Sequence, residues 1–514
     1  MTEAAWFVGA ARSVIDEGVY LNAGRLVFEG ALPYRDFPFS QGPLVPYVYG
    51  AALEGFGVSV VVGRWLSFAL GALGFAATLW VAWTLGGRLA TTVFAVLSMA
   101  NLPALWVATT VRTQSLSTPL TLLGLAALAL PRRGPLSWAV SPSLLLWSTG
   151  ARLTNVLAFL AVCGWVAVRL RDQPKRLAGV AAIVAAQALV LFAPVLVALN
   201  DAIFHIVTAQ LGRGDRAGAR ETSLFEGLYA KFMVFLAPET SFVAILALTG
   251  VVVIGLVARA RRGWRPDLAR PLEDAGTAQL VTIVLAVLVF LPHLLLNRGF
   301  LTYFVTSSSL LVLAIAIGVA EIARESGRGS RLAAVAAAGL VALGVALVPA
   351  HWSAWIGSGP SSFPHFREVA REVRSRAGDS CTMVTMETAL AVEAGCRVLP
   401  GLEYSMFSYF PGLSDEEAAR RGVVNQDLLV ARVRDLRPEL IVLGPRGRSS
   451  LRLGAGKGAP PSPGFLAPRG YTFSARHRIS SGAHVRVAPD SVAVDVFVRD
   501  DLARRAPATL DELP

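Results

Sequence analysis

Long runs of apolar residues dominate the first 350 positions of the chain, and short polar connectors separate them. A helix of about 20 residues, rising about 1.5 Å per residue, crosses a hydrocarbon layer of about 30 Å. The pattern therefore predicts about ten membrane-spanning helices. Their expected ranges are 58–84, 89–108, 115–131, 137–150, 154–170, 177–199, 239–259, 278–296, 301–322 and 332–350. The short segment 137–150 indicates a tilted, kinked or partly inserted helix.

Composition agrees with a membrane protein. Of the 514 residues, 54% are hydrophobic and 16% are charged, and the mean hydropathy is +0.56. A soluble domain has about a quarter of its residues charged, so much of this chain lies where charge is costly. The formal net charge of +12 does not indicate nucleic-acid binding, because the basic residues gather in short clusters between apolar segments. The lipid bilayer is the expected partner.

Arginine and lysine are unequally divided between alternating connectors. The richer connectors contain Arg88, Arg132, Arg171, Arg261 and Arg328, and the poorer ones contain Arg112, Arg152 and Arg298. Basic loops remain in the cytoplasm, so residues 1–57 and everything after residue 350 are predicted to be extracytoplasmic, on a multi-pass inner or plasma membrane protein. Met1–Ile15 is too short to cross a bilayer. This placement predicts either a first span upstream of Met1 or an interfacial helix over residues 4–15.

Polar residues return after His351, and the chain changes character. Alternating and helical patterns predict a small extracytoplasmic α/β domain over 351–514, which follows a first loop over 1–57 and a transmembrane domain over 58–350. The expected strands are 382–386 and 440–443, the helices 388–395 and 427–436, the loop 454–468 and a closing hairpin 483–487 with 491–498. Cys381 and Cys396 are compatible with a disulfide in an oxidising compartment and equally with two buried free thiols.

The first extracytoplasmic segment holds the most informative acids. Asp16 and Glu17 begin a helical pattern, and Asp36 lies in the following Pro/Gly-rich loop. Acids are favourable at a helix N-terminus because of the helix dipole, so the pair at 16 and 17 has a purely structural explanation. Clustered carboxylates also suit proton transfer.

Several motifs resemble a known family. DEGVY at 16–20, GALPYRDF at 30–37, QGPLVPY at 41–47 and VGRWLS at 62–67 are similar to the first exoplasmic loop of GT-C glycosyltransferases. The similarity is strongest to the bacterial branch with protein mannosyltransferases, aminoarabinose transferase and lipopolysaccharide galacturonosyltransferases. In outline it extends over 16–350 and includes the loop 200–240 and NRGFLTYF at 297–304. The span that precedes the acid pair in the family is missing here.

The resemblance implies an activity. It implies transfer of a sugar from a polyprenyl-phosphate carrier to a hydroxyl or amine of a lipid, glycan or protein acceptor, on the extracytoplasmic face and with inversion. Asp16 matches the general base of the family. Glu17 and Asp36 would serve as a second base, as groups that orient the acceptor, or as metal ligands. A divalent cation such as Mg or Mn is compatible with such carboxylates, but the resemblance does not require one.

The leaving phosphate needs cations, which Arg152 and Arg298 would supply from the outer ends of spans. Arginines at these positions also reach lipid headgroups in proteins without such a site. Tyr20, Tyr34 and Tyr303 suit a site that binds sugar or lipid, although aromatic belts at membrane surfaces account for them equally well.

Two other function classes compete with the transferase. A transporter or flippase places ionisable groups near the bilayer midplane and often has related halves, whereas this chain has nearly charge-free spans and no repeated half. A non-catalytic protein of envelope-polysaccharide assembly could have the same fold. The three acids Asp16, Glu17 and Asp36 argue against it.

Overall fold

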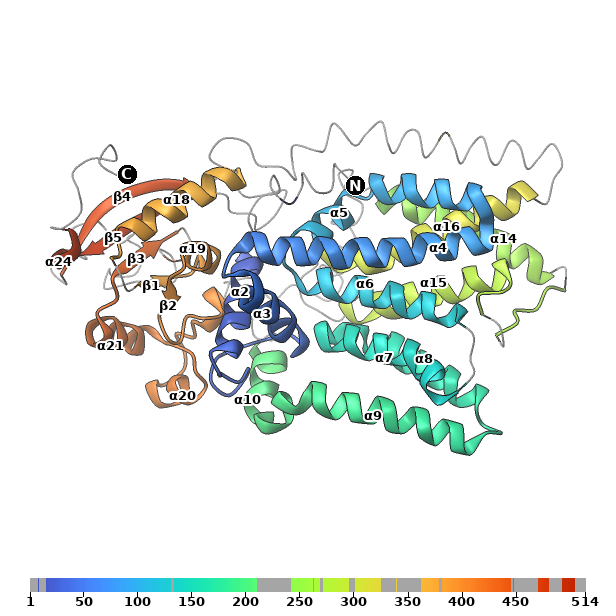
Figure 1. Ribbon diagram of the computed structural model, residues 1–514, viewed down its shortest axis with the longest axis horizontal. Helices are drawn as coiled ribbons and strands as arrows, with labels where there is room; N and C mark the ends of the chain where they lie inside the picture. Colours follow the sequence, from blue (N-terminus) through green and yellow to red (C-terminus); the bar gives the residue numbers. More distant parts are fainter. Residues whose placement is uncertain are drawn as a thin grey trace.

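The computed structural model describes residues 15–130, 134–209, 242–261, 263–268, 271–294, 301–324, 362–378, 381–444, 470–479 and 492–503, and three single residues, Val8, Gly339 and Gly447. A bundle of long helices occupies one end of the molecule and an α/β domain occupies the other (Figure 1). Helices α2 (Ile15–Phe28) and α3 (Leu44–Phe56) lie between them.

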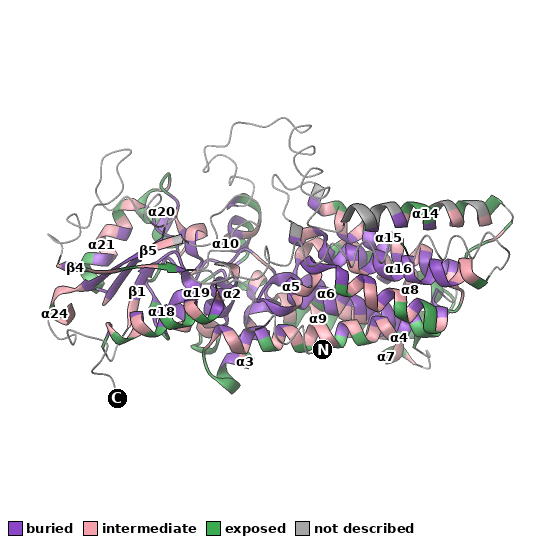
Figure 2. Ribbon diagram, turned by 90° about the horizontal axis from the view of Figure 1, so that it is seen from above, coloured by how far each residue is buried: buried purple, intermediate pink, exposed green. Residues whose placement is uncertain are grey.

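Most helices of the bundle follow the apolar segments of the sequence. They are α4 (Val60–Ala100), α5 (Leu102–Thr109), α6 (Thr113–Ala126), α7 (Pro135–Ala151), α8 (Val156–Arg169), α9 (Pro174–Val197), α14 (Phe242–Arg261), α15 (Ala275–Leu294) and α16 (Val305–Arg324). Short helical turns complete it: η1 (Ala127–Ala129), η2 (Leu153–Asn155), α10 (Leu199–Ile203), the π-helical η3 (Phe204–Thr208) and η5 (Leu301–Phe304). Helix α16 is buried over most of its length (Figure 2).

Helix α4 turns back on itself at Gly87. The backbone there has φ 62° and ψ −153°, a conformation that essentially only glycine adopts. Phe75 and Phe94 stack with ring centroids 5.4 Å apart, whereas 19 residues of straight helix would separate them by about 28 Å. The two spans predicted at 58–84 and 89–108 are therefore two arms of a hairpin, and the second arm is interrupted at Asn101 before α5.

Four helices of the described chain are long and apolar enough to cross a membrane: Val60–Ala100, Pro174–Val197, Ala275–His293 and Thr302–Arg324; Leu153–Arg169 is apolar but shorter. The predicted span at 332–350 lies outside the described residues, as does most of the loop 200–240. The ends of α14 and α16 and the turn of α4 meet at one end of the bundle, where Arg324 Nη1 donates to the carbonyl of Leu85 (3.0 Å) and Arg259 pairs with Glu321 (2.6 Å).

The α/β domain contains a five-stranded sheet of order β2-β1-β3-β5-β4. The strands are β1 (Thr382–Thr385), β2 (Arg397–Val398), β3 (Leu440–Leu443), β4 (Tyr471–Ile479) and β5 (Val492–Arg499). Its helices are α18 (Phe363–Ser375), α19 (Thr388–Glu393), η7 (Ser405–Ser408), α20 (Asp415–Arg420), α21 (Gln426–Leu436) and α24 (Asp500–Ala503). Strands β2, β1 and β3 are parallel, and β5 runs antiparallel to both β3 and β4.

Sequence patterns located most of these elements. The predicted strand 440–443 matches β3, and the predicted helices at 388–395 and 427–436 match α19 and α21 to within a few residues. Among the described residues β5 pairs with β3 on one side and with β4 on the other, and the sequence analysis did not predict β4. The hairpin partner expected at 483–487 lies outside the described residues. Cys381 and Cys396 form a disulfide, which decides between the two alternatives left open by the sequence.

One hydrophobic core joins the first loop to the α/β domain. It contains first-loop residues such as Leu21, Phe39 and Tyr49 together with Phe363 and Leu390 of the domain, all buried. The bundle interior forms a second core around α16. Helix α2 thus packs against α19 of the α/β domain and α3 packs against α2, although about 300 residues of sequence separate these helices from the domain.

Candidate active site

Asp16 lies in the first turn of α2, where its carboxylate faces the helical bundle. Oδ2 of Asp16 accepts a hydrogen bond from Nη1 of Arg112 at 3.0 Å, and the Asp16 side chain is 37% exposed. Arg112 immediately precedes α6, and its guanidinium also lies over the ring of Trp106 at 4.2 Å. The pair places a partly exposed carboxylate next to a largely buried cation.

Glu17 faces a different direction and is fully buried. Nε and Nη2 of Arg64 donate to its two carboxylate oxygens, each at 2.8 Å, and the backbone N–H of Val111 also donates to it. Both side chains are 0% exposed. The Arg64 guanidinium lies 3.8 Å from the ring centroid of Phe363, at the start of α18. Glu17 therefore joins α2, α4 and the α/β domain at one point.

Arg152 lies at the same end of the bundle, between α7 and η2. Its Nη1 donates to Oγ1 of Thr113 at 2.9 Å, and its guanidinium lies 4.7 Å from the ring centroid of Tyr303. Only 7% of Arg152 is exposed. Since Thr113 follows Arg112 directly, the two arginines approach the beginning of α6 together.

Tyr20, one helical turn after Asp16, connects these groups. Burial raises the pKa of its phenol well above the ordinary value, Tyr404 and Asp16 raise that pKa further, and Arg152 and Arg112 lower it. Each of the four groups is close enough to affect the phenol electrostatically. The structure therefore brings together Asp16, Tyr20 and Arg152 from the predicted set, and Tyr303 through Arg152.

Other predicted residues lie elsewhere. The Asp36 carboxylate bonds to Arg35 and to the backbone N–H of Leu32, and the hydrogen bond from Arg35 holds the pKa of Asp36 below its ordinary value. The Tyr34 hydroxyl donates to the carbonyl of Gln41 within the same loop (2.5 Å), and its ring is 1% exposed. Arg298 lies outside the described residues.

Arg112 is the functional candidate that the sequence analysis missed. It entered that analysis only as one basic residue of the poorer connectors. The same signal that selected Arg152, a cation where an outer loop meets a span, also applies to Arg112. The sequence does not reveal the 3.0 Å contact between Arg112 and Asp16, because these residues are 96 positions apart.

The acids do not converge on one point. Within the described part of the chain, no three side chains of His, Cys, Asp or Glu stand close enough together to hold a metal ion. Asp16 and Glu17 each bind a different arginine instead. The described geometry is thus a carboxylate next to two cations, an arrangement suited to taking a proton beside a bound anion.

Comparisons with known proteins identify the architecture. No protein-family model matches the chain, and no curated protein matches it in sequence. Among solved structures, it is similar to apo ArnT from Cupriavidus metallidurans (TM-score 0.58, 14% identity), over 98% of this chain and 97% of that one. It is also similar to the Archaeoglobus fulgidus oligosaccharyltransferase (TM-score 0.50, 11% identity), over 86% of this chain and 65% of that one. Both belong to the GT-C superfamily.

The chain has the GT-C fold. At these identities the likeness establishes the fold and leaves the chemistry to the site itself. A second ArnT structure, with undecaprenyl phosphate bound, superimposes less closely (TM-score 0.44, 14% identity, 96% of each chain). In this chain the Asp16–Arg112–Arg152 group lies where the bundle meets the first loop, next to the α/β domain of the fold.

Proposed function

We propose that this protein is a membrane glycosyltransferase that moves a sugar from a polyprenyl-phosphate carrier to an acceptor hydroxyl or amine. The observation that carries the proposal is the contact between Asp16 and Arg112, with the buried Arg152 next to them. A base and two phosphate-binding cations are the groups that such a transfer requires. The GT-C fold supports the same conclusion.

Asp16 acts as the general base. Its Oδ2 binds Arg112, and Oδ1 has no hydrogen-bond partner among the described residues. An acceptor hydroxyl placed against Oδ1 would lose its proton to the carboxylate as it attacks the anomeric carbon, a contribution of about 10²–10⁴-fold to the rate. A single displacement of this kind inverts the anomeric configuration.

Arg112 and Arg152 bind the carrier phosphate. Charge develops on the phosphate as the glycosidic bond breaks, and fixed cations that face it stabilise the transition state. Burial of both guanidinium groups strengthens this effect, because water screens them little. ArnT of C. metallidurans binds undecaprenyl phosphate, which supports a long polyprenyl carrier for this chain as well.

Glu17 and Asp36 have supporting roles in this proposal. Both oxygens of Glu17 are used by Arg64, and none of the side chain is exposed, so it holds α2 in place. Asp36 stabilises its own loop through Leu32 and Arg35. The site opens toward the extracytoplasmic face, and the acceptor is a lipid, glycan or protein.

The test compares envelope glycolipids, glycoproteins and polysaccharides by mass spectrometry in a deletion strain, complemented with wild type, Asp16→Asn or Glu54→Gln. Glu54 is an exposed acid of the same loop and serves as the matched control. We expect one glycoconjugate to lose a single sugar in the deletion and in Asp16→Asn, but not in Glu54→Gln. Full restoration by Asp16→Asn at normal protein level would refute Asp16 as the base, and an unchanged deletion profile would refute the transferase.

A further inference from the structure

We propose that the α/β domain positions Asp16. The domain packs against α2, the helix that carries this base, and the contact lies at the carboxyl edge of its parallel strands. The inference rests on the proposed function. It assigns positioning roles to Gly18 and Arg25, which the sequence analysis did not name as site residues.

The contact between α2 and the domain lies where an α/β sheet usually binds a ligand. Strands β1 and β3 are parallel, and their carboxyl ends lead into Glu387 and Gly444, which adjoin each other. Ligands of open α/β sheets bind beside such strand ends. Here α19 begins at Thr388, and α2 packs directly against it. The helix α2 therefore occupies the side of the domain where a ligand would otherwise bind.

Gly18 makes this contact possible. A Cβ atom at Gly18 would overlap the backbone N of Ala389 and the carbonyl carbon of Thr388. Both are backbone atoms, which cannot rotate away as a side chain does, so a larger residue must displace α2. Asp16 is two residues from Gly18, so a displacement of α2 that removes the overlap would break the 3.0 Å contact between Asp16 and Arg112.

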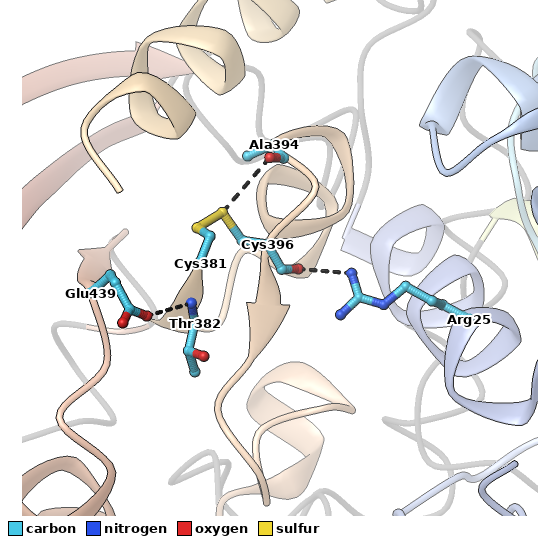
Figure 3. The surroundings of a disulfide bond; sticks show 6 residues. All are labelled: Arg25, Cys381, Thr382, Ala394, Cys396 and Glu439. Atoms are coloured by element: carbon cyan, nitrogen blue, oxygen red, sulfur yellow. Dashed lines mark hydrogen bonds between the residues drawn. A yellow bond between two sulfur atoms is a disulfide. The ribbon is translucent and has the colours of Figure 1, made fainter. Parts of the chain in front are cut away.

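A second contact fixes the other end of the helix. Nη1 of Arg25 donates to the carbonyl oxygen of Cys396 at 3.0 Å (Figure 3). Cys396 is disulfide-bonded to Cys381, next to β1, so the acceptor of this hydrogen bond belongs to a cross-linked part of the domain. Between these two contacts, Nδ2 of Asn22 donates to the carbonyl of Glu403 at 3.3 Å. Contacts thus extend along α2 from Gly18 to Arg25.

The domain also fixes the helix that carries the partner of Glu17. The Glu393 carboxylate at the end of α19 accepts hydrogen bonds from the hydroxyl of Ser59 (2.9 Å) and the N–H of Val60 (2.8 Å), at the N-terminus of α4. An acid at this position is favourable for a helix N-terminus. Helix α19 thus contacts both α2 and α4, and it sets the position of the base relative to the bundle that holds Arg112.

The test measures transfer, carrier binding and thermal unfolding with full-length protein in detergent. The variants are Gly18→Ala and, as the matched control, Gly55→Ala in α3, where a Cβ meets nothing within 4 Å. Gly18→Ala should lower kcat at least 10-fold and leave the Kd for undecaprenyl phosphate within about two-fold of wild type. Gly55→Ala should leave both unchanged. This separation of kcat from carrier binding is not expected of general unfolding.

A second variant covers the case in which Gly18→Ala does not fold. Arg25→Met adds no atoms at the contact and removes the hydrogen bond to Cys396, and it should lower kcat several-fold with the same unchanged carrier binding. Wild-type kcat in folded Gly18→Ala and Arg25→Met would overturn the inference. Since Asp16→Asn tests the base directly, an inactive Asp16→Asn beside fully active Gly18→Ala would reject the positioning role alone.

Discussion

Glu17 and Arg64, 47 positions apart, form a two-pronged ion pair from which solvent is excluded. Adjacent acids of one helix turn thus have opposite environments, because Asp16 stays partly exposed beside Arg112. The helical rotation of about 100° per residue directs the two carboxylates to different neighbours. One acid becomes a structural anchor and the other remains available for proton transfer.

The first prediction concerns this anchor. Glu17→Gln leaves the Arg64 charge buried without its carboxylate, and removal of one partner of a buried pair costs about 3–5 kcal/mol. We expect a marked fall in the thermal unfolding temperature in detergent. The double variant Glu17→Gln/Arg64→Met should recover part of the loss, since no buried charge is left over. An unchanged unfolding temperature in Glu17→Gln would contradict a structural role.

Carrier binding provides the second prediction. Arg112→Met and Arg152→Met each remove a buried cation, and hydrogen bonds to charged groups contribute about 1.5–3 kcal/mol. The Kd for undecaprenyl phosphate should therefore rise about 10-fold to 100-fold in each variant. The exposed Arg35, paired with Asp36, provides the control Arg35→Met. If all three variants bound undecaprenyl phosphate as tightly as the wild type, Arg112 and Arg152 would not bind the phosphate.

A third prediction follows from the disulfide. Cys381 and Cys396 are 15 positions apart, and closure of a loop of about this length stabilises a protein by about 3 kcal/mol in the chain-entropy description. A reductant should lower the unfolding temperature of the wild type. Cys381→Ser/Cys396→Ser should already have the lower value and show no further response. Identical unfolding of the wild type with and without reductant would count against this contribution.

The fourth prediction is a pH dependence. Burial raises the pKa of Glu403 to about 7, against smaller lowering effects of backbone hydrogen bonds and of Arg432. The folded state therefore holds this proton more tightly than the unfolded state, and stability falls as pH rises from about 4.5 to about 7, by at most about 1.4 kcal/mol per pH unit. Glu403→Gln should remove this part of the slope. The measurement is the unfolding temperature of the wild type and of Glu403→Gln between about pH 4.5 and pH 7. The same pH dependence in both proteins would refute a contribution from Glu403.

The sequence predicted local elements well because their causes are local. Apolar segments located the helices of the bundle, and the sequence analysis also located β3, a short run of four buried apolar residues, and β5, where apolar and polar residues alternate. The missed strand β4 is buried only at its two ends, Tyr471 and Ile479, and the seven residues between them are exposed or half-buried. Its pattern is therefore weak, and its assignment depends on pairing with β5.

By itself, the sequence determined a helical membrane protein with a small α/β domain and singled out Asp16 and Arg152, because hydropathy and residue type are properties of each segment. The tertiary structure alone decided which partner each charged group has. Asp16 meets Arg112 across 96 positions, Glu17 meets Arg64 across 47, and Arg25 meets Cys396 across 371. Contacts of this kind depend on how helices pack in three dimensions, and the pattern along one segment does not record them.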